Sequence, residues 1–240
     1  MKVEVWSDFA CPFCYIGKRQ LEGALSQFPN KDQVEVVYRS FQLDPTMERD
    51  TNMDMHQVLA SKYGMSLEQA KGMNDRVAQQ AKGVGLDYYF NTMIPTNTFD
   101  AHRLAHYAAT HGKMTEMKER LLKAYFTESL HLGDHEVLSQ LASEVGLDKA
   151  ETLAMLAGDE YKDKVQEDKQ RGADLGINGV PFFVFNNKYA VSGAQPGEVF
   201  LGALNKVWEE EQAAAPLQFV GQDEKEKTAG DNCADGSCKL

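Results

Sequence analysis

The feature that most constrains how this chain folds is a pair of cysteines near its N-terminus, in the stretch SDFACPFCYIGK at residues 7–18. Apolar and polar residues alternate just before this stretch, which predicts a first strand. Proline is favoured at the first position of a helix, so Pro12 predicts a helix that begins there and leaves Cys11 at its N-cap. An apolar stripe extends this helix to Pro29, and VEVVYR at residues 34–39 predicts a second strand parallel to the first.

The stretch from residue 46 to residue 175 has an almost wholly helical pattern, and no segment of it repeats. Side chains that accept hydrogen bonds from the first free N–H groups of a helix precede most of its apolar stripes. We expect this region to be a helical insertion. The expected caps are Ser66 with Gln69, Asn97 or Thr98, Asp134, Asp148 with Glu151, and Asp159.

A strand pattern returns in GVPFFVFNNKYAVSG at residues 179–193. Two short strands, 182–185 and 188–191, are expected on either side of an Asn-Asn pair, because asparagine tolerates the positive φ of a tight hairpin turn. A last helix is expected from Pro196 to about Glu211.

Without the helical insertion, the order of elements is strand, helix, strand, hairpin and helix, with Cys-x-x-Cys at the start of the first helix. This order resembles the thioredoxin fold, so the expected fold class is α/β, a thioredoxin fold with a large helical insertion. We expect residues 1–45 and 176–212 to form the thioredoxin-like domain and residues 46–175 the insertion. Residues 213–240 are expected to form an acidic C-terminal tail.

Charge and hydropathy limit the partners and the compartment. The formal net charge of −11 argues against a nucleic-acid partner, which needs a basic face. No apolar run approaches the roughly eighteen residues of a transmembrane helix, so we expect no membrane partner. The chain runs directly into its first strand without the apolar region of a signal peptide, which predicts a cytoplasmic protein. Structural disulfides are rare in that compartment, so a Cys-x-x-Cys there is typical of redox catalysis or metal binding.

The placement of the two cysteines suits thiol–disulfide exchange. The attacking species is the thiolate, and a helix N-terminus lowers a thiol pKa from about 8.5 to roughly 3.5–7.5, because unpaired N–H groups and the helix dipole favour an anion. Cys11 is therefore the expected nucleophile. Cys14 lies one turn further along on the same side, where it can resolve a mixed disulfide formed at Cys11. The alternative is two buried, inert cysteines.

Three stretches carry a narrower resemblance: SDFACPFCYIGK, NTFDAHRLAHYA at residues 97–108 and GINGVPFFVFNNKYAVSGAQ at residues 176–195. Together they resemble the DsbA-family thiol–disulfide oxidoreductases of the FrnE type, whose relatives include 2-hydroxychromene-2-carboxylate isomerase and kappa-class glutathione transferase. The resemblance spans roughly residues 3–212. It implies thiol–disulfide exchange, with Cys11 as nucleophile and Cys14 as resolving thiol.

The resemblance also implies that Val180-Pro181 is a cis peptide that binds substrate beside the cysteines. The central dipeptide of the motif, Pro12-Phe13, offers Cys11 no imidazole donor, so we expect a weaker oxidant than the periplasmic members of the family. The isomerase and transferase branch typically has serine at the first cysteine position. Cysteine at both positions here favours redox chemistry.

Further residues are candidate neighbours of the cysteines. Asp8 is close to them in sequence and is a candidate proton acceptor for Cys14, although a polar loop residue is an equal interpretation. The resemblance places four more residues towards the active-site side, namely Asn97, Thr98, His102 and Arg103.

A second cysteine pair, Cys233 and Cys238, lies on the acidic tail among few residues of the core-forming kind. Cysteines outside a core favour a second redox pair. A flexible tail of this length spans about 25 Å, estimated from 5–6 Å times the square root of the residue number, which is enough to reach Cys11. The four cysteines together also permit a tetrahedral zinc site.

We therefore expect a protein thiol–disulfide oxidoreductase, with disulfide isomerase activity as a further option. The expected partners are proteins or peptides with thiols or disulfides, and small-molecule thiols are a further substrate class. No cofactor or metal is expected. Two alternatives stay open: a glutathione-dependent isomerase or transferase acting on a small molecule, and a redox-sensing or zinc-binding regulatory protein.

Overall fold

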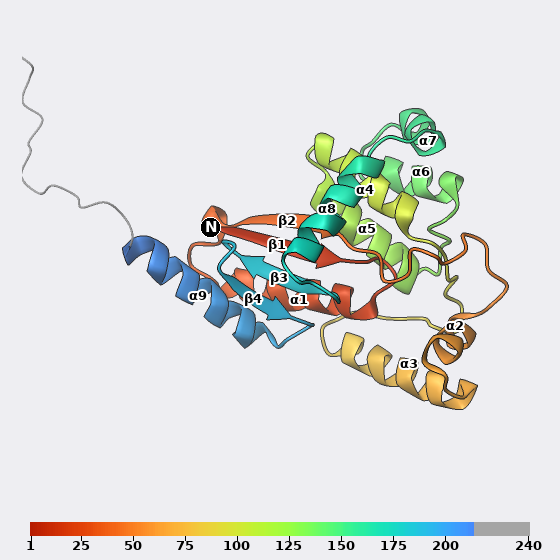
Figure 1. Cartoon of the computed structure of the whole chain (residues 1–240), viewed down its shortest axis with the longest axis horizontal. Coiled ribbons are helices and arrows are strands. Elements are labelled where there is room, and N and C mark those ends of the chain that lie inside the picture. Colours follow the sequence, from red (N-terminus) through yellow and green to blue (C-terminus); the bar gives the residue numbers. More distant parts are fainter. Residues whose placement is uncertain (214–240) are drawn as a thin grey trace, which may run out of the picture.

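The computed structural model describes residues 1–213 of the chain, so Cys233 and Cys238 lie outside the described residues. Its centre is a four-stranded sheet in the order β2-β1-β3-β4 (Figure 1). The strands are β1 (Lys2–Ser7), β2 (Glu35–Ser40), β3 (Phe182–Phe185) and β4 (Tyr189–Ser192).

The pairing of the strands matches the sequence patterns. β1 and β2 are parallel, as predicted, and β1 is antiparallel to β3. β3 and β4 form the predicted hairpin. Its turn residues, Asn186 and Asn187, have φ values of 49° and 53°, the positive φ that was expected of them.

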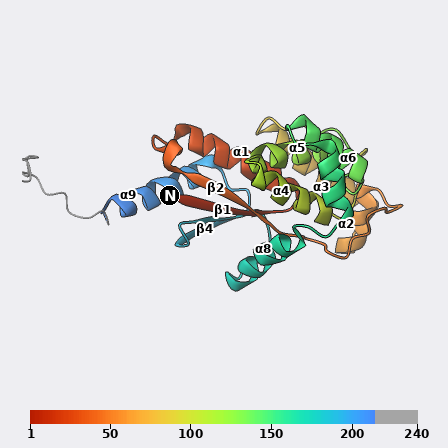
Figure 2. The same ribbon diagram turned by 90° about the horizontal axis from the view of Figure 1, so that it is seen from above.

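Helices cover both faces of the sheet (Figure 2). α1 (Pro12–Gln27) and α9 (Gly197–Ala213) pack on one face, and α8 (Lys162–Asp174) packs on the other. Val3 and Val5 of β1 pack in the core beneath α1 and α9. Trp6 belongs to the opposite face, where its Nε1–H donates to the Asp168 carbonyl of α8 at 2.9 Å. β1 is therefore buried on both faces and fixes the start of the loop that follows it.

The chain between β2 and α8 forms a second core at one end of the sheet (Figure 1). Phe9 and Tyr15, which flank the cysteines, pack in this core with residues of α4 and α5. The cysteines thus lie where the two parts of the molecule meet. The helices of this region are α2 (Met55–Tyr63), α3 (Leu67–Lys82), α4 (Phe99–Thr110), α5 (Met114–Phe126), α6 (His135–Glu144) and α7 (Lys149–Ala157).

Most of the expected helix caps are confirmed. The Ser66 hydroxyl and the Asp148 carboxylate accept hydrogen bonds from the N–H groups three residues on, and Asp134 caps α6. The cap expected at Asp159 is wrong. α8 begins at Lys162, after Tyr161 in the left-handed region, and the Asp159 carboxylate pairs with the Lys162 ammonium instead.

The stretch that was expected to be almost wholly helical is interrupted: residues 83–98, which join α3 to α4, contain no helix. α8 ends just before the predicted boundary at residue 176 and packs on both α4 and β2, so this boundary stays a prediction. None of the helices within residues 1–213 has the length and apolarity that a membrane-spanning helix needs.

Candidate active site

Cys11 occupies the N-cap of α1, as predicted. Its backbone is extended, Pro12 stands in the first turn of the helix, and the Cys14 N–H donates to the Cys11 carbonyl at 3.0 Å. Both cysteines are free thiols and both are only 3% exposed. Cys11 is therefore less accessible than we expected of a thiol at a helix N-terminus. The residues that surround Cys11 limit how a substrate can approach its sulfur.

Val180 and Pro181 lie directly beside Cys11. The peptide bond between them is cis, as expected, and the Cys11 thiol donates to the Val180 carbonyl at 3.5 Å. β3 begins only at Phe182, so the Val180 backbone pairs with no strand of the described chain. α1 approaches this segment closely because Gly17 has no side chain: a Cβ there would lie 3.1 Å from the Pro181 ring.

A cleft of about 490 Å³ opens beside the start of α1 and the Val180-Pro181 segment. Phe13 is 39% exposed, which is high for a side chain of its size, and it stands at the edge of this cleft. The cleft is lined mainly by apolar groups, among them Phe13, Val84, Val180, Pro181, Ala194 and Pro196.

A buried polar network lies on the other side of the cysteines, centred on Asp8. The Asp8 N–H donates to Cys14 Sγ at 3.4 Å, which ties the loop to the second cysteine. One carboxylate oxygen accepts hydrogen bonds from the Thr98 hydroxyl at 2.7 Å and from His102 Nε2 at 3.2 Å. The other accepts from the Leu43 N–H at 2.8 Å. The structure thus brings Asp8, Thr98 and His102 together at the cysteines.

The charges in this network follow from burial and hydrogen bonding. Burial alone would raise the pKa of Asp8, but the hydrogen bonds from His102, Leu43 and Thr98 lower it below its usual value. Burial lowers the pKa of His102 despite the neighbouring carboxylate. His102 Nδ1 is buried and has no hydrogen-bond partner among the described residues. Asp8 is therefore an anion held by neutral donors.

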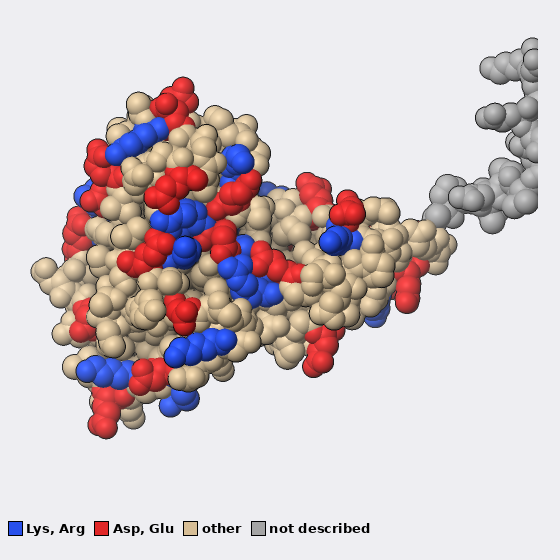
Figure 3. Space-filling view, turned by 180° about the vertical axis from the view of Figure 1, so that it is seen from behind, with Lys and Arg blue, Asp and Glu red and all other residues tan. Residues whose placement is uncertain are grey.

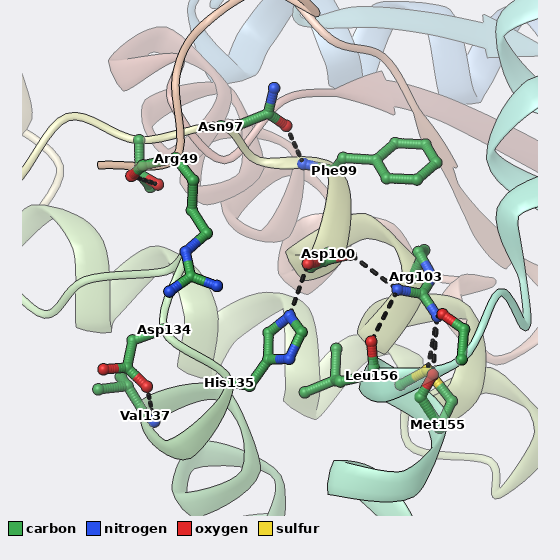
Figure 4. Close-up of polar contacts among 12 residues, drawn as sticks. Arg49, Asn97, Phe99, Asp100, Arg103, Asp134, His135, Val137, Met155 and Leu156 are labelled. Carbon is green, nitrogen blue, oxygen red and sulfur yellow. Dashed lines mark hydrogen bonds and ion pairs between the residues drawn. The ribbon is translucent and has the colours of Figure 1, made fainter. Parts of the chain in front are cut away.

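Two of the expected neighbours lie further from the cysteines. Asn97 fastens the start of α4 to the loop after β2: its carbonyl accepts from the Phe99 N–H, and its amide donates to the Met47 carbonyl. Arg103 does not join the cysteines, contrary to expectation. Its guanidinium points to the C-terminal end of α7, where it donates to the Met155 and Leu156 carbonyls, and it also pairs with Asp100 (Figure 4).

Sequence reasoning missed Lys118 of α5. This lysine is 2% exposed, and its ammonium lies 4.2 Å from the centroid of the Phe9 ring and 5.8 Å from that of Tyr38. Burial lowers its pKa to about 8, against the opposing influence of Cys14 and Asp8. The signal was present in the sequence, because Lys118 lies on the apolar stripe that includes Leu121 and Leu122.

A second, mostly apolar cavity of about 150 Å³ lies beyond the loop that carries Asp8 and Pro12. It is walled by side chains of the helical region, among them Met55, Phe90 and Phe126. Among residues 1–213, no group of three or more His, Cys, Asp or Glu side chains is arranged to hold a metal ion. On the face drawn in Figure 3, acidic and basic side chains of the described residues are intermixed.

Comparisons with known proteins agree with this geometry. The family model described as a DSBA-like thioredoxin domain matches residues 2–205. A crystal structure of a probable DsbA oxidoreductase from Streptomyces coelicolor is 43% identical, with a TM-score of 0.85, over 92% of this chain and 94% of that one. An uncharacterized protein, YwbO from Bacillus subtilis, is 29% identical over 85% of this chain and 95% of its own length.

A more distant structure shares the fold. The cytosolic disulfide reductase DsbM from Pseudomonas aeruginosa, solved with glutathione, is 16% identical, with a TM-score of 0.59, over 90% of this chain and all of that one. The family model covers most of the chain, including both cysteines and the Val180-Pro181 segment. The chain therefore belongs to the family of proteins with a DSBA-like thioredoxin domain, and the predicted resemblance to FrnE-type oxidoreductases fits this family.

Proposed function

We propose that this protein catalyses thiol–disulfide exchange on protein or peptide substrates through Cys11 and Cys14. The observation that carries the proposal is the placement of Cys11 at the N-terminus of α1, with its thiol against the Val180 carbonyl. Free N–H groups and the helix dipole at this end favour a thiolate. A pair of free thiols in this position fits membership of the DSBA-like family.

The reaction has two steps. The Cys11 thiolate attacks one sulfur of a substrate disulfide, which forms a mixed disulfide and releases the first substrate thiolate. Cys14 then loses a proton and attacks Cys11 Sγ, which releases the second substrate thiolate and leaves the Cys11–Cys14 disulfide. Two electrons pass from the cysteine pair to the substrate, and the same steps in reverse oxidise a dithiol.

The cleft beside Pro181 supports an extended polypeptide as the substrate. The Val180 backbone stands at the start of β3 without a strand partner in the described chain, so an extended segment can pair with it as an added strand. Phe13 and Val84, which line the cleft, offer apolar surface to such a segment. We also propose a cytoplasmic location, in line with the cytosolic reductase that shares the fold.

The test is turnover of a disulfide-linked peptide with glutathione as reductant, measured for the parent chain, Cys11→Ser and Cys14→Ser. Cys11→Ser should lose activity, because no nucleophile remains. Cys14→Ser should accumulate a mixed disulfide at Cys11, which mass spectrometry identifies. Near-normal turnover by Cys11→Ser would reject the proposal.

We further propose that Cys233 and Cys238 form a second redox pair that exchanges electrons with Cys11 and Cys14. The support is the sequence: two thiols on an acidic segment with few core-forming residues. The test is gentle oxidation of the Cys14→Ser protein followed by peptide mapping. A link from Cys11 to either tail cysteine is expected; no such link, with unchanged activity after removal of residues 230–240, would exclude exchange.

Small-molecule thiols are a second candidate class of substrate. The apolar cavity beyond Pro12 is about the size that admits a benzene-sized group, which favours a small ligand near the cysteines. Isomerase activity on a chromene carboxylate in the presence of glutathione separates this candidate from the first. The Cys11→Ser protein should lose peptide reduction in either case, whereas only a glutathione-dependent isomerase converts the chromene.

A further inference from the structure

Tyr88 lies in residues 83–98, the segment that joins α3 to α4, and its ring is packed in the second core. The ring stacks on Phe126, with centroids 4.6 Å apart, and meets the edge of Phe90 at 5.8 Å. Only 7% of the residue is exposed. Aromatic packing on these sides fixes the position of the one polar group of the side chain, its hydroxyl.

The Tyr88 hydroxyl binds the backbone between the two cysteines. It donates to the Pro12 carbonyl at 2.8 Å, and among the described residues it makes no other hydrogen bond. Pro12 stands in the first turn of α1, directly after Cys11. A residue 76 positions away in the chain therefore contacts the main chain of the Cys-x-x-Cys motif.

The peptide that receives this bond carries a free donor at its other end. The Pro12 carbonyl and the Phe13 N–H belong to one planar peptide group, and the Phe13 N–H has no acceptor among residues 1–213. A residue at an N-cap accepts from the N–H two or three positions on. Cys11 has the extended backbone of such a cap, with φ −91° and ψ 111°. The Phe13 N–H is therefore the free donor that this cap geometry assigns to Cys11.

The cap hydrogen bond belongs to the ionised state of Cys11. As a thiol, Cys11 donates to the Val180 carbonyl and accepts no hydrogen bond at the cap. A thiolate has no proton to donate, so it gives up the bond to Val180 and becomes an acceptor only. The strength of the first-turn donors then determines how stable the thiolate is.

We propose that Tyr88 is a positioning residue that stabilises the Cys11 thiolate through the Pro12-Phe13 peptide; this rests on the proposed function. Hydrogen bonds in a chain polarise one another, so donation to the Pro12 carbonyl makes the Phe13 N–H a stronger donor. The Tyr88 O–H and the peptide are aligned head to tail, with their positive ends towards the cap. The low dielectric of the packed core strengthens this effect.

The Tyr88 hydroxyl remains a donor when Cys11 ionises. Burial raises the pKa of Tyr88, and negative charge at Cys11 raises it further. Replacing Tyr88 with phenylalanine leaves every other titratable group around the cysteines in place. These groups are Cys14, Tyr15 and Arg19 of α1, Asp8 of the loop and Lys118 of α5.

Tyr88→Phe keeps the ring and its stacking but removes the donor. The variant and the parent are compared as full-length chains in which Cys14, Cys233 and Cys238 are serine, which leaves a single thiol. Each chain is mixed with 5,5′-dithiobis(2-nitrobenzoic acid) across a pH series. The Cys11 thiolate attacks one sulfur of the reagent, the disulfide of the reagent breaks, and the coloured thiolate that leaves reports the rate.

We expect the two pH profiles to cross. Loss of the polarisation, roughly 10–30% of a charge-assisted bond, should reduce the thiolate fraction at acid pH by about two- to threefold. The remaining thiolate is more basic and a better nucleophile, with a Brønsted coefficient of about 0.4–0.5. Tyr88→Phe should therefore react about 1.5-fold more slowly than the parent below the midpoint of the profile and about 1.5-fold faster above it.

Tyr89→Phe is the matched control. Tyr89 is the next residue of the same segment, it is 53% exposed, and its hydroxyl makes no hydrogen bond among the described residues. Its profile should coincide with that of the parent. A loosened helix end, or an opened path to Cys11, would change the rate by one factor at every pH, and this separates a purely structural role from the proposed one.

The equilibrium of the cysteine pair gives a second readout. Chains that keep Cys11 and Cys14 are placed in glutathione buffer above the midpoint of the profile, where glutathione disulfide takes two electrons from the pair and leaves as two glutathione thiols. A less stable thiolate makes the reduced pair less stable. The ratio of oxidised to reduced pair should therefore rise about two- to threefold in Tyr88→Phe.

The outcomes distinguish the two proposals. Profiles that coincide, or that differ by one constant factor, would overturn the role of Tyr88, as would an unchanged ratio in glutathione buffer. If Cys11 of the parent chain does not attack the reagent and forms no disulfide with Cys14, the proposed function fails instead, whatever the variant does.

Discussion

At the scale of the residue, Asp8 holds the loop before the cysteines in place. Its two carboxylate oxygens accept hydrogen bonds from donors in two different segments: Thr98 and His102 at the start of α4, and Leu43 after β2. A buried carboxylate with all its neighbours donating is a rigid anchor. The position of Cys14 depends on this anchor through the Asp8 N–H.

Asp8→Asn tests this anchoring role. An amide accepts at one end only, so one buried donor loses its partner, and we expect the free energy of unfolding to fall by about 1–3 kcal/mol. Thiol–disulfide exchange should still be present, because Cys11 and Cys14 are retained. Denaturant unfolding measures the loss, and Asp75→Asn, an exposed aspartate on α3, is the control. An unchanged stability in Asp8→Asn would contradict the anchoring role.

The residues that we propose carry the chemistry were predicted from motifs, whereas a buried residue of the same region was missed. Cys11, Cys14 and Pro181 stand in local patterns that can be recognised without a structure. Lys118 is far from them in the chain, and its position beside Phe9 and Tyr38 follows from the fold. Arg103 is the opposite case. It lies in a motif that resembles the family, but its side chain donates hydrogen bonds to backbone carbonyls at the C-terminal end of α7.

At the scale of the element, the approach of α1 to the Val180-Pro181 segment depends on one glycine. A Cβ on Gly17 would lie 3.1 Å from both the Pro181 and Phe183 side chains, closer than nearly all real contacts of this kind. Gly23, two turns further along the same helix, has nothing within 4 Å of the same position. The two glycines therefore form a matched pair for substitution.

Gly17→Ala and Gly23→Ala should have opposite effects. Alanine in an open helical position gains about 0.5–1 kcal/mol over glycine, so Gly23→Ala should be stabilised by roughly that amount. Gly17→Ala should lose about 1 kcal/mol, because overpacking costs about 1–3 kcal/mol and outweighs the gain in propensity. Its exchange rate should also fall, as α1 moves relative to Pro181. Equal stabilisation of both variants would mean that the contact at Gly17 is unimportant.

The elements themselves were predictable where local signals dominate. Local hydrogen bonds or a restricted φ fix the backbone at several positions. These are Pro12, the Asn-Asn turn and the capping residues of α3, α6 and α7. The packing of α8 on the sheet was not predictable. Its amphipathic pattern is the same whether it packs on helices or on a sheet, and the residues that attach it to the sheet, Glu4, Trp6 and Arg39, are distant in sequence.

At the scale of the whole molecule, ion pairs of two glutamates join elements that are distant in sequence. Glu4 of β1 binds Arg39 and Arg171, and Glu119 of α5 binds Lys18 and Arg19 of α1. Burial alone would raise the pKa of each glutamate, but the hydrogen bonds from these cations lower both to about 2. An unfolded glutamate has a pKa of about 4.3. Between the folded pKa of about 2 and the unfolded pKa of about 4.3, the unfolded chain therefore binds more protons than the folded chain.

This difference predicts acid sensitivity. Because the folded pKa values are depressed, the stabilisation is present above about pH 4.5 and is lost as pH falls towards 2. The free energy of unfolding should be nearly constant between pH 7 and 5 and fall steadily below about 4.5. Glu4→Gln should start lower at pH 7 and depend less on pH. A stability that rises between pH 5 and 3 would contradict the role of these pairs.

The central claim is that Cys11 and Cys14 form a working redox pair, and the most direct measurement is a redox titration of the full-length chain. The protein is equilibrated in glutathione buffers, and the disulfides are mapped by mass spectrometry after acid quenching. We expect a Cys11–Cys14 disulfide that forms and breaks reversibly as a two-electron couple, changing tenfold in ratio for about 30 mV. A pair that stays reduced throughout, or that oxidises only irreversibly, would contradict the claim.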